Sequence, residues 1–253
     1  MGSLASRVMV VLLGLATTFS VYSEEPEKIR LNQIQLIGTH NSYHVALPKS
    51  ALEKLGKIKK GWENSLDYTH RPLTEQLGNL DVRHFELDLF ADPAGGHLLK
   101  KGALSLLGLA MPQPESFRKA MEVPGFKVLH EPSVDRLTTT PSLISALKEI
   151  RTWSLKNPKH IPLFILLEMK DKSPVPFTNR PIPFNRKMLA AVEAEILTVF
   201  KVTQLITPDS VRGNAQTLRK AVQGKGWPTL EESRGKMMFG LDNSGKIRDL
   251  YLK

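Results

Sequence analysis

The chain has 253 residues, of which 41% are hydrophobic and 24% are charged, and its formal net charge is +10. These proportions are typical of one globular domain with a sizeable core, and no repeats or long low-complexity tracts interrupt them. Cysteine is absent, which excludes disulfides, so stability has to come from the core and from ions. The positive charge favours contact with anionic lipid surfaces, although many basic proteins are simply soluble.

Residues 1–23 differ from the rest of the chain. Arg7 is their only charged residue, the run from Val8 to Ala16 is apolar throughout, and Val21-Tyr22-Ser23 precedes Glu24. The apolar run is too short to span a bilayer comfortably. The pattern predicts a secretory signal peptide over residues 1–23, a single mature domain over residues 24–253, and a secreted or periplasmic location. A buried N-terminal helix is the alternative.

The first predicted strand of the mature chain ends in a run of polar residues. Ile34 and Leu36 lead into Gly38-Thr39, and His40-Asn41-Ser42-Tyr43 follows directly. Three later apolar runs also end in polar side chains, as buried parallel strands do when their carboxyl ends carry a functional site. They contain Phe85-Glu86-Leu87-Asp88, Val128-Leu129-His130 and Ile165-Leu166-Leu167-Glu168. The sequence therefore predicts that two histidines, one amide and three carboxylates face one pocket.

Residues 49–60 predict an amphipathic basic helix. Lysines occupy one side, and the other side carries apolar residues at helical spacing, namely Ala51, Leu52, Leu55 and Ile58. Such a helix could lie on a membrane surface, or it could pack on the domain with its lysines in solvent. A second apolar stretch, Leu98 to Met111, is too short to span a bilayer and predicts either a membrane-dipping lip or ordinary packing.

The second predicted strand runs from Asp81 to Phe90 and carries two acidic residues on one face. Side chains alternate along a strand, so Glu86 and Asp88 point the same way. Two unpaired carboxylates in a barrel interior repel each other, and a shared divalent cation relieves the repulsion most simply. The alternative is a pair of separate salt bridges.

Two further predicted strands carry polar residues near their ends. Pro124 to Pro132 places Val128 and His130 on one face. The histidine is either a functional group of the site or a polar side chain with only structural hydrogen bonds. Ile161 to Lys170 places Glu168 and Lys170 on one face. The lysine suits a phosphate oxygen of a substrate, and an ion pair with Glu168 or Asp171 is the alternative.

Helices and strands alternate along the rest of the chain. Helical patterns follow Thr140-Pro141-Ser142, cover Arg186 to Phe200, and cover Thr217 to Val222. Leu205 to Pro208 predicts a short fifth strand, and Met237 to Asp242 a sixth. This alternation favours an α/β fold in which parallel strands form a barrel.

The polar motifs together resemble one known family. The set Gly38-Thr39-His40-Asn41-Ser42-Tyr43, Phe85-Glu86-Leu87-Asp88, His130 and Leu167-Glu168 is similar to the calcium-dependent phosphoinositide-specific phospholipase C family. The nearest branch is that of the small secreted, bacterial-type members of the PLC-like phosphodiesterase superfamily. The similarity extends over nearly all of the mature chain through residues 124–130, 157–162 and 227–230.

The resemblance implies roles for individual residues. It implies a TIM-type barrel, catalytic histidines at His40 and His130, and calcium ligands at Asn41, Glu86, Asp88 and Glu168. It also implies cleavage of phosphatidylinositol-type lipids to diacylglycerol and an inositol cyclic phosphate at a membrane surface. Calcium prefers hard oxygen ligands, which agrees with three carboxylates and an amide. We expect no nucleic-acid partner and no obligate protein partner.

Two other functions remain open at this point. Glu86-Leu87-Asp88, His130 to Arg136 and Glu168-Met169-Lys170 are also similar to glycerophosphodiester phosphodiesterases. The usual first motif of that family has arginine and glycine after the histidine, where this chain has Asn41-Ser42. The second alternative is an inactive lipid- or membrane-binding homologue, which the basic segment 49–60 supports and the retention of all six polar positions opposes.

The number of predicted strands indicates an incomplete barrel. Six strands are predicted, whereas a closed barrel of this type has eight, and closure is what removes exposed edges. We therefore expect the C-terminal part of the barrel to be missing from the chain as given. In the alternative, residues 247–252 help to close a smaller barrel.

Overall fold

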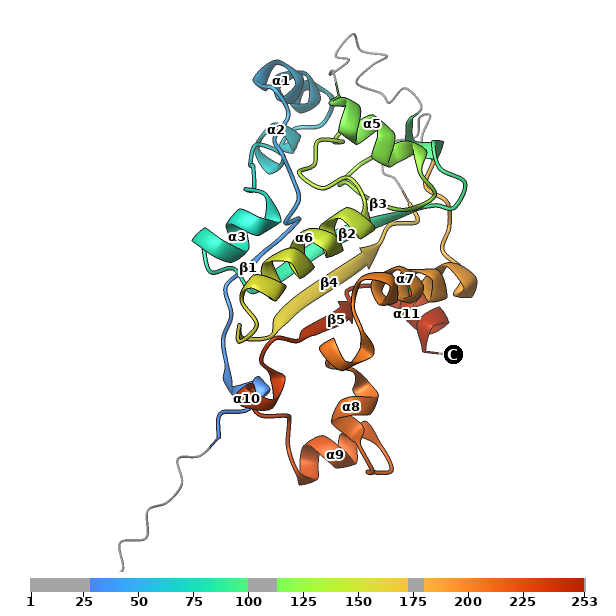
Figure 1. The fold of residues 1–253 in the computed structure, drawn as a ribbon. Coiled ribbons are helices and arrows are strands. Elements are labelled where there is room, and N and C mark those ends of the chain that lie inside the picture. The colour runs from blue at the N-terminus through green and yellow to red at the C-terminus, as the bar shows by residue number, and fades with distance from the viewer. Residues whose placement is uncertain (1–27, 100–112, 173–179, 253) are drawn as a thin grey trace, which may run out of the picture.

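A mixed sheet of five strands occupies the centre of the described chain (Figure 1). The computed structural model describes residues 28–99, 113–172 and 180–252, so the predicted signal peptide and most of the apolar stretch from Leu98 to Met111 lie outside the described residues. The strands are β1 (Gly38–Thr39), β2 (His84–Asp92), β3 (Gly125–Val128), β4 (Leu163–Met169) and β5 (Met237–Leu241). The predicted α/β class is confirmed.

β2 is the strand on which the sheet is built. Its first half pairs in parallel with β1 on one edge and with β4 on the other, and β5 extends the sheet beyond β4 in parallel. In this register Phe85 lies beside Thr39 of β1 and Ile165 of β4. Because side chains alternate along a strand, Glu86 then points to the face opposite to that of Phe85.

β3 runs antiparallel to β2, so the prediction of a parallel third strand was wrong. Val128 pairs with Leu89 and Gly125 with Asp92, along the part of β2 that extends beyond β1. The reason lies in the lengths of the strands: β2 has 9 residues and β1 only 2, and the remaining backbone groups on that edge of β2 need partners. After Val128 the chain therefore runs back toward the level of Asp88, and it brings His130 with it.

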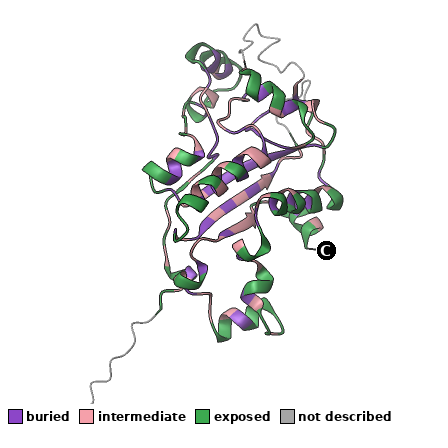
Figure 2. Ribbon diagram, viewed as in Figure 1, coloured by how far each residue is buried: buried purple, intermediate pink, exposed green. Residues whose placement is uncertain are grey.

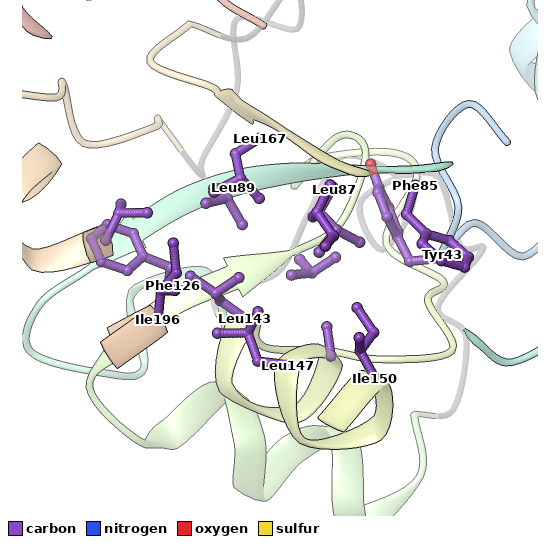
Figure 3. Close-up of a cluster of buried hydrophobic side chains, with 14 of the residues drawn as sticks. Tyr43, Phe85, Leu87, Leu89, Phe126, Leu143, Leu147, Ile150, Leu167 and Ile196 are labelled. Atoms are coloured by element: carbon purple, nitrogen blue, oxygen red, sulfur yellow. The ribbon is translucent and has the colours of Figure 1, made fainter. Parts of the chain in front are cut away.

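Three helices cover one face of the sheet and form the main core with it (Figures 1 and 3). They are α3 (Leu73–Asn79), α6 (Leu143–Lys156) and α7 (Arg186–Val199). Ser142 caps α6 and Asn185 caps α7, each with a side-chain oxygen that accepts a backbone N–H from the first turn. The core is aliphatic and aromatic, and it includes Phe85, Leu87, Leu89, Leu143, Leu147, Ile150, Ile165, Leu167 and Ile196.

The residues of β4 that point away from these helices are more exposed than those that face them. Along β4, buried residues alternate with partly exposed ones (Figure 2). Ile165 and Leu167 are buried against the helices, whereas Leu166 and Glu168 are partly exposed on the other face. The polar residues of the strands can therefore meet on that second face without entering the apolar core.

Shorter elements surround this framework. The predicted basic helix is α1 (Lys49–Ile58), and its apolar residues Ala51, Leu52 and Leu55 pack against Leu66 and Val134. None of the helices in the described ranges is both long and apolar enough to cross a membrane. The remaining helices are α2 (Trp62–Ser65), α5 (Glu115–Glu122), α8 (Pro208–Arg212), α9 (Leu218–Gly224), α10 (Leu230–Ser233) and α11 (Gly245–Tyr251), with 3-10 turns η1 (Leu31–Gln33), η2 (His97–Leu99) and η3 (Val202–Gln204).

The sheet remains open at β5 over the described residues. The predicted fifth strand, Leu205 to Pro208, is reduced to one bridge between Leu205 and Met237. Pro208 has no N–H to donate to a ladder, and Thr207 caps α8 by accepting the N–H of Ser210, so the run cannot continue as a strand. The described part of the chain thus forms an open parallel sheet with one antiparallel strand, and it does not close into a barrel.

The close approach of β1 to β2 requires glycine at position 38. A Cβ atom there would lie 2.9 Å from the Cβ of His84. We expect Gly38→Ala to lower the free energy of unfolding by about 1–3 kcal/mol, as overpacking does in well-packed interiors. Urea unfolding followed by circular dichroism measures this change.

Gly224→Ala is the matched control for that measurement. Gly224 ends α9, and a Cβ atom there meets nothing within 4 Å. Alanine is a better helix former than glycine, so this change should leave stability equal or slightly raised. Equal effects of the two substitutions would contradict the tight packing of β1 on β2.

Candidate active site

Three carboxylates gather on the face of the sheet opposite to α6 and α7. Glu86 of β2, Glu168 of β4 and Asp242, which follows β5, each place a carboxylate oxygen within 4.8 Å of the other two. The N–H of Asp242 donates to the carbonyl of Leu167 at 3.0 Å, which continues the pairing of β5 with β4. The Asn243 side chain then accepts from the N–H of Met169 and donates to its carbonyl. These bonds hold Asp242 beside the end of β4.

The loop after β1 forms hydrogen bonds with both the backbone and the carboxylate of Glu86. The Asn41 N–H donates to Glu86 Oε2 at 2.9 Å. The Ser42 N–H donates to the carbonyl of Glu86, and Ser42 Oγ accepts the N–H of Glu86. Asn41 has a φ of 46°, in the left-handed region that asparagine tolerates better than most residues. The tight turn thus places residues 40–42 directly over Glu86.

The side chain of Asn41 is oriented by two tyrosines. Its amide nitrogen donates to Tyr68 Oη at 2.9 Å, and its Oδ1 accepts from Tyr43 Oη at 3.1 Å. Burial, followed by the nearby Asp88 carboxylate, raises the pKa of Tyr43 well above its usual range, so the phenol remains a donor. Asn41 Oδ1 is thereby held in a buried environment close to the carboxylates.

Asp88 is a buried carboxylate whose main neighbour is a cation. It is fully buried, and Tyr43 and Lys170 are the polar groups close to it. Burial raises the pKa of Asp88 to about 7, in spite of the opposing charge of Lys170. Lys170 Nζ lies 3.2 Å from Asp88 Oδ2 and 2.5 Å from Glu168 Oε2. The structure therefore shows Lys170 in ion pairs with two carboxylates.

This arrangement fits a hard divalent cation. The cluster offers only oxygen donors, which is the ligand type that calcium prefers. Lys170 already pairs with Glu168 and Asp88, so positive charge is stabilised beside the cluster. Asp88 is fully buried beside these carboxylates, and a carboxylate in such a place is stabilised by nearby positive charge. Of the four predicted ligands, the structure brings Glu86 and Glu168 into the cluster, places Asp88 beside Lys170, and ties Asn41 to Glu86.

His40 lies at the exposed edge of the same site. Its side chain is 78% exposed, and Nε2 is 3.4 Å from Glu86 Oε2. Glu86 is thus the carboxylate that the ring approaches, and most of the ring is open to solvent. A group in this position can contact a substrate that approaches from outside the protein.

His130 belongs to a separate hydrogen-bonded group. Its Nδ1 lies 2.8 Å from Asp135 Oδ2, and the same oxygen lies 2.8 Å from His44 Nε2. His44 and Asp135 are fully buried, whereas the His130 side chain is 30% exposed. Burial lowers the pKa of His130, but the hydrogen bond and charge of Asp135 outweigh burial and raise it above its ordinary value.

A cavity of about 260 Å³ opens beside this group. Its lining includes His130, Asp135 and Lys170, so it adjoins the ion pairs of the carboxylate cluster. Because His130 Nδ1 is bonded to Asp135, Nε2 is the nitrogen left for a molecule in the cavity. The remaining lining residues include Lys59, Trp62, Leu66 and Lys172.

Sequence reasoning missed three residues of this site. Asp242 carries the same signal as the predicted ligands, since it is a carboxylate that directly follows the apolar run of β5. Asp135 and His44 carry no comparable signal, because neither follows an apolar run and they meet only through the tertiary fold.

Comparison with known proteins gives a family match and a structural likeness. The model of the family described as Phosphoinositide phospholipase C, Ca2+-dependent matches residues 29–253. Among solved structures, a calcium-dependent phosphoinositol-specific phospholipase C from the Gram-negative bacterium Pseudomonas sp., in its apo form, matches with a TM-score of 0.50 and 20% identity, over 87% of this chain and 60% of that chain. This likeness shows the fold.

A second solved structure and the curated proteins complete the comparison. A Ca2+-dependent phosphatidylinositol-specific phospholipase C from Streptomyces antibioticus matches with a TM-score of 0.46 and 18% identity, over 81% of this chain and 51% of that chain. No curated protein matches the chain. The chain therefore spans between 51% and 60% of the length of these two solved proteins.

Asp135→Asn should lower the pKa of His130, because it removes the charge that raises this pKa. The sign of the effect on stability follows from both partners. The pKa of His130 is raised, so its contribution to folding stability is present below about pH 6.5 and is lost as the pH rises through the pKa of the folded state. The pKa of Asp135 is lowered, so its contribution to folding stability is present above about pH 3.9 and is lost in acid. The stability difference between the two proteins should therefore be largest near pH 5–6.

NMR titration of the His130 ring and urea unfolding at pH 5.5 and pH 8.5 would measure these two effects. Asp209→Asn is the control, since Asp209 is an exposed carboxylate that pairs with Arg212 in α8. A titration of His130 that is unchanged in Asp135→Asn would show that the bond to Asp135 does not set its protonation.

Proposed function

This chain belongs to the Ca2+-dependent phosphoinositide phospholipase C family, and from this membership we propose that it cleaves phosphatidylinositol-type lipids to diacylglycerol and an inositol cyclic phosphate. The family is one of phosphoric diester hydrolases, and it is calcium-dependent, as the sequence motifs imply. The observation that carries the proposal is the cluster of Glu86, Glu168 and Asp242, with His40 at its edge and His130 in the wall of the adjoining cavity.

The carboxylate cluster is the proposed calcium site. Glu86, Glu168 and Asp242 supply carboxylate oxygens, and Asn41 Oδ1 is held nearby by Tyr43. Asp88 is the remaining predicted ligand, and it becomes available if Lys170 turns away toward a phosphate oxygen of the substrate. Calcium bound here would increase the acidity of the inositol 2-hydroxyl and offset negative charge on the phosphoryl group.

The residues of the chain then divide the proton transfers between them. A carboxylate, Glu86 or Glu168, accepts the proton of the 2-hydroxyl as its oxygen attacks the adjacent phosphorus. The bond between phosphorus and the glycerol oxygen breaks, and His130 Nε2 gives its proton to that oxygen, which leaves as diacylglycerol. Asp135 favours the protonated ring that this step requires. His40 is placed to donate to a phosphoryl oxygen.

Membrane contact and export are part of the same proposal. The lysines of α1 are exposed, and Lys59 and Trp62, which follow it, line the cavity beside His130. A basic surface at the mouth of the site favours approach to an anionic lipid surface. We also propose that residues 1–23 direct export and that residues 24–253 form the catalytic domain, which needs neither nucleic acid nor an obligate protein partner.

Product analysis tests the proposed function. The protein is incubated with phosphatidylinositol vesicles and, separately, with glycerophosphoinositol, each with calcium or with a chelator. We expect diacylglycerol and an inositol cyclic phosphate from the vesicles, and only in calcium, because calcium at the carboxylate cluster would supply the positive charge that the reaction needs. Glycerol 3-phosphate from the deacylated substrate would indicate a glycerophosphodiester phosphodiesterase. Vesicle binding without any product would indicate an inactive homologue, and full activity in chelator would contradict the metal assignment.

Asp242→Asn tests the ligand that sequence reasoning missed. Removing one charged ligand should raise the calcium concentration for half-maximal cleavage on the order of tenfold, because ligand charge sets calcium affinity. Calcium titration of the rate of lipid cleavage measures it. Asp249→Asn, at an exposed aspartate paired with Arg248 in α11, is the control and should leave the calcium requirement unchanged. A calcium requirement of Asp242→Asn equal to that of the unaltered protein would remove Asp242 from the proposed ligands.

A further inference from the structure

We propose that His44, His130 and Asp135 form a second metal site, distinct from the carboxylate cluster, for a borderline transition ion such as Zn2+. We further propose that occupation of this site inhibits lipid cleavage, and this second step rests on the proposed function. The site is regulatory in effect, because the ion would hold the histidine that the reaction uses as its proton donor.

The geometry of the three side chains is close to that of a zinc site. His44 Nε2 and His130 Nδ1 each lie 2.8 Å from Asp135 Oδ2, and the three ligand atoms all lie within 4.8 Å of one another. Around a tetrahedral zinc with bonds of about 2.0–2.1 Å, neighbouring ligand atoms are separated by about 3.3 Å. An outward shift of the side chains by roughly half an ångström would therefore admit the ion.

The hydrogen-bond partners of His44 also point to a ligand. Its Nδ1 lies 2.9 Å from the carbonyl oxygen of Tyr68, which can only accept, so Nδ1 carries a proton. Its Nε2 lies 2.8 Å from Asp135 Oδ2, another acceptor, so Nε2 donates in this bond and must lose its proton before it can bind a metal. A histidine whose far nitrogen donates to a backbone carbonyl while the near nitrogen faces other ligands is the usual arrangement around a bound metal.

Asp135 supplies an independent observation. The residue is fully buried, and its Oδ1 has no hydrogen-bond partner within the described structure. An unpartnered buried carboxylate oxygen is costly, and a metal ion that binds the carboxylate would remove part of that cost. The pairing with two histidines alone therefore leaves this carboxylate only partly satisfied.

The chemistry of the donors separates this site from the calcium site. Two imidazole nitrogens and one carboxylate suit zinc, whereas calcium prefers sets of oxygens such as Glu86, Glu168 and Asp242. The His130 side chain is 30% exposed at the cavity wall, so an ion has a path from solvent and a fourth position open to water. The two ions should therefore bind without competing for ligands.

Zinc at this site would remove the proton donor. The ion takes the Nδ1 lone pair of His130, so the ring no longer becomes an imidazolium. The Nε2–H of a neutral, metal-bound ring is a far weaker acid than an imidazolium. The glycerol oxygen would then have to leave without an efficient proton donor, and cleavage would slow.

Zinc binding is measured without lipid, on chelator-treated full-length protein in excess calcium. Isothermal titration with Zn2+ should show one site per chain, and Co2+ in place of Zn2+ should give the strong visible absorption of a tetrahedral ion. His44→Gln and Asp135→Asn should each weaken zinc binding by about tenfold or more. His97→Gln is the control, since His97 hydrogen-bonds the carbonyl of Arg180 and lies outside the group, and it should bind zinc as the unaltered protein does.

The outcomes separate the two proposals. Absence of stoichiometric zinc binding, an octahedral Co2+ spectrum, or equal binding by His44→Gln would overturn the site. If a variant does not fold by circular dichroism, the Co2+ spectrum of the unaltered protein decides. Zinc should slow cleavage of phosphatidylinositol at constant calcium, and a zinc-selective chelator should restore it; full cleavage by zinc-loaded protein would overturn the inhibition. Zinc binding by a protein that cleaves no lipid would contradict only the proposed function.

Discussion

The register of β2 against its three neighbouring strands is the constraint on which the site depends. A shift of one residue would exchange the two faces of the strand, and Glu86 would enter the apolar core while Phe85 joined the polar face. Pairing with β1 on one edge and β4 on the other prevents this shift, and β3 holds the far half of the strand. The packing of the apolar face of the strand therefore keeps Glu86 on the polar face.

Charge compensation is the second theme of the site. A sheet face that collects four carboxylates would be destabilised by their mutual repulsion and by the burial of Asp88. Lys170 offsets part of this repulsion. Asp135 is instead held by hydrogen bonds to His44 and His130. The carboxylate cluster is thus matched by a lysine, and the single buried Asp135 by two histidines.

Much of the site could be predicted from the sequence because strand side chains alternate and apolar runs mark buried strands. That reasoning predicted Glu86 and Glu168, which the structure places in one cluster, and Asp88, which lies beside Lys170. The roles of the two histidine candidates stay predictions. The same reasoning failed where a contact depends on the path of the chain between elements. The antiparallel direction of β3 follows from the unequal lengths of β1 and β2, and the meeting of His44 with Asp135 follows from that direction. Neither leaves a periodic pattern in the sequence.

The antiparallel course of β3 also bears on the order in which the parts of the site form. Asp92 pairs with Gly125, whereas Gly38 pairs with His84, His84 with Phe164 and Leu163 with Met237. The ribbon of β2 and β3 therefore closes a shorter loop than any of the three parallel pairings. Loop closure costs entropy that grows with length, and distant pairings form slowly. His130 therefore reaches the level of Asp88 through local structure, while the three-carboxylate cluster must await the most distant segments of the described chain.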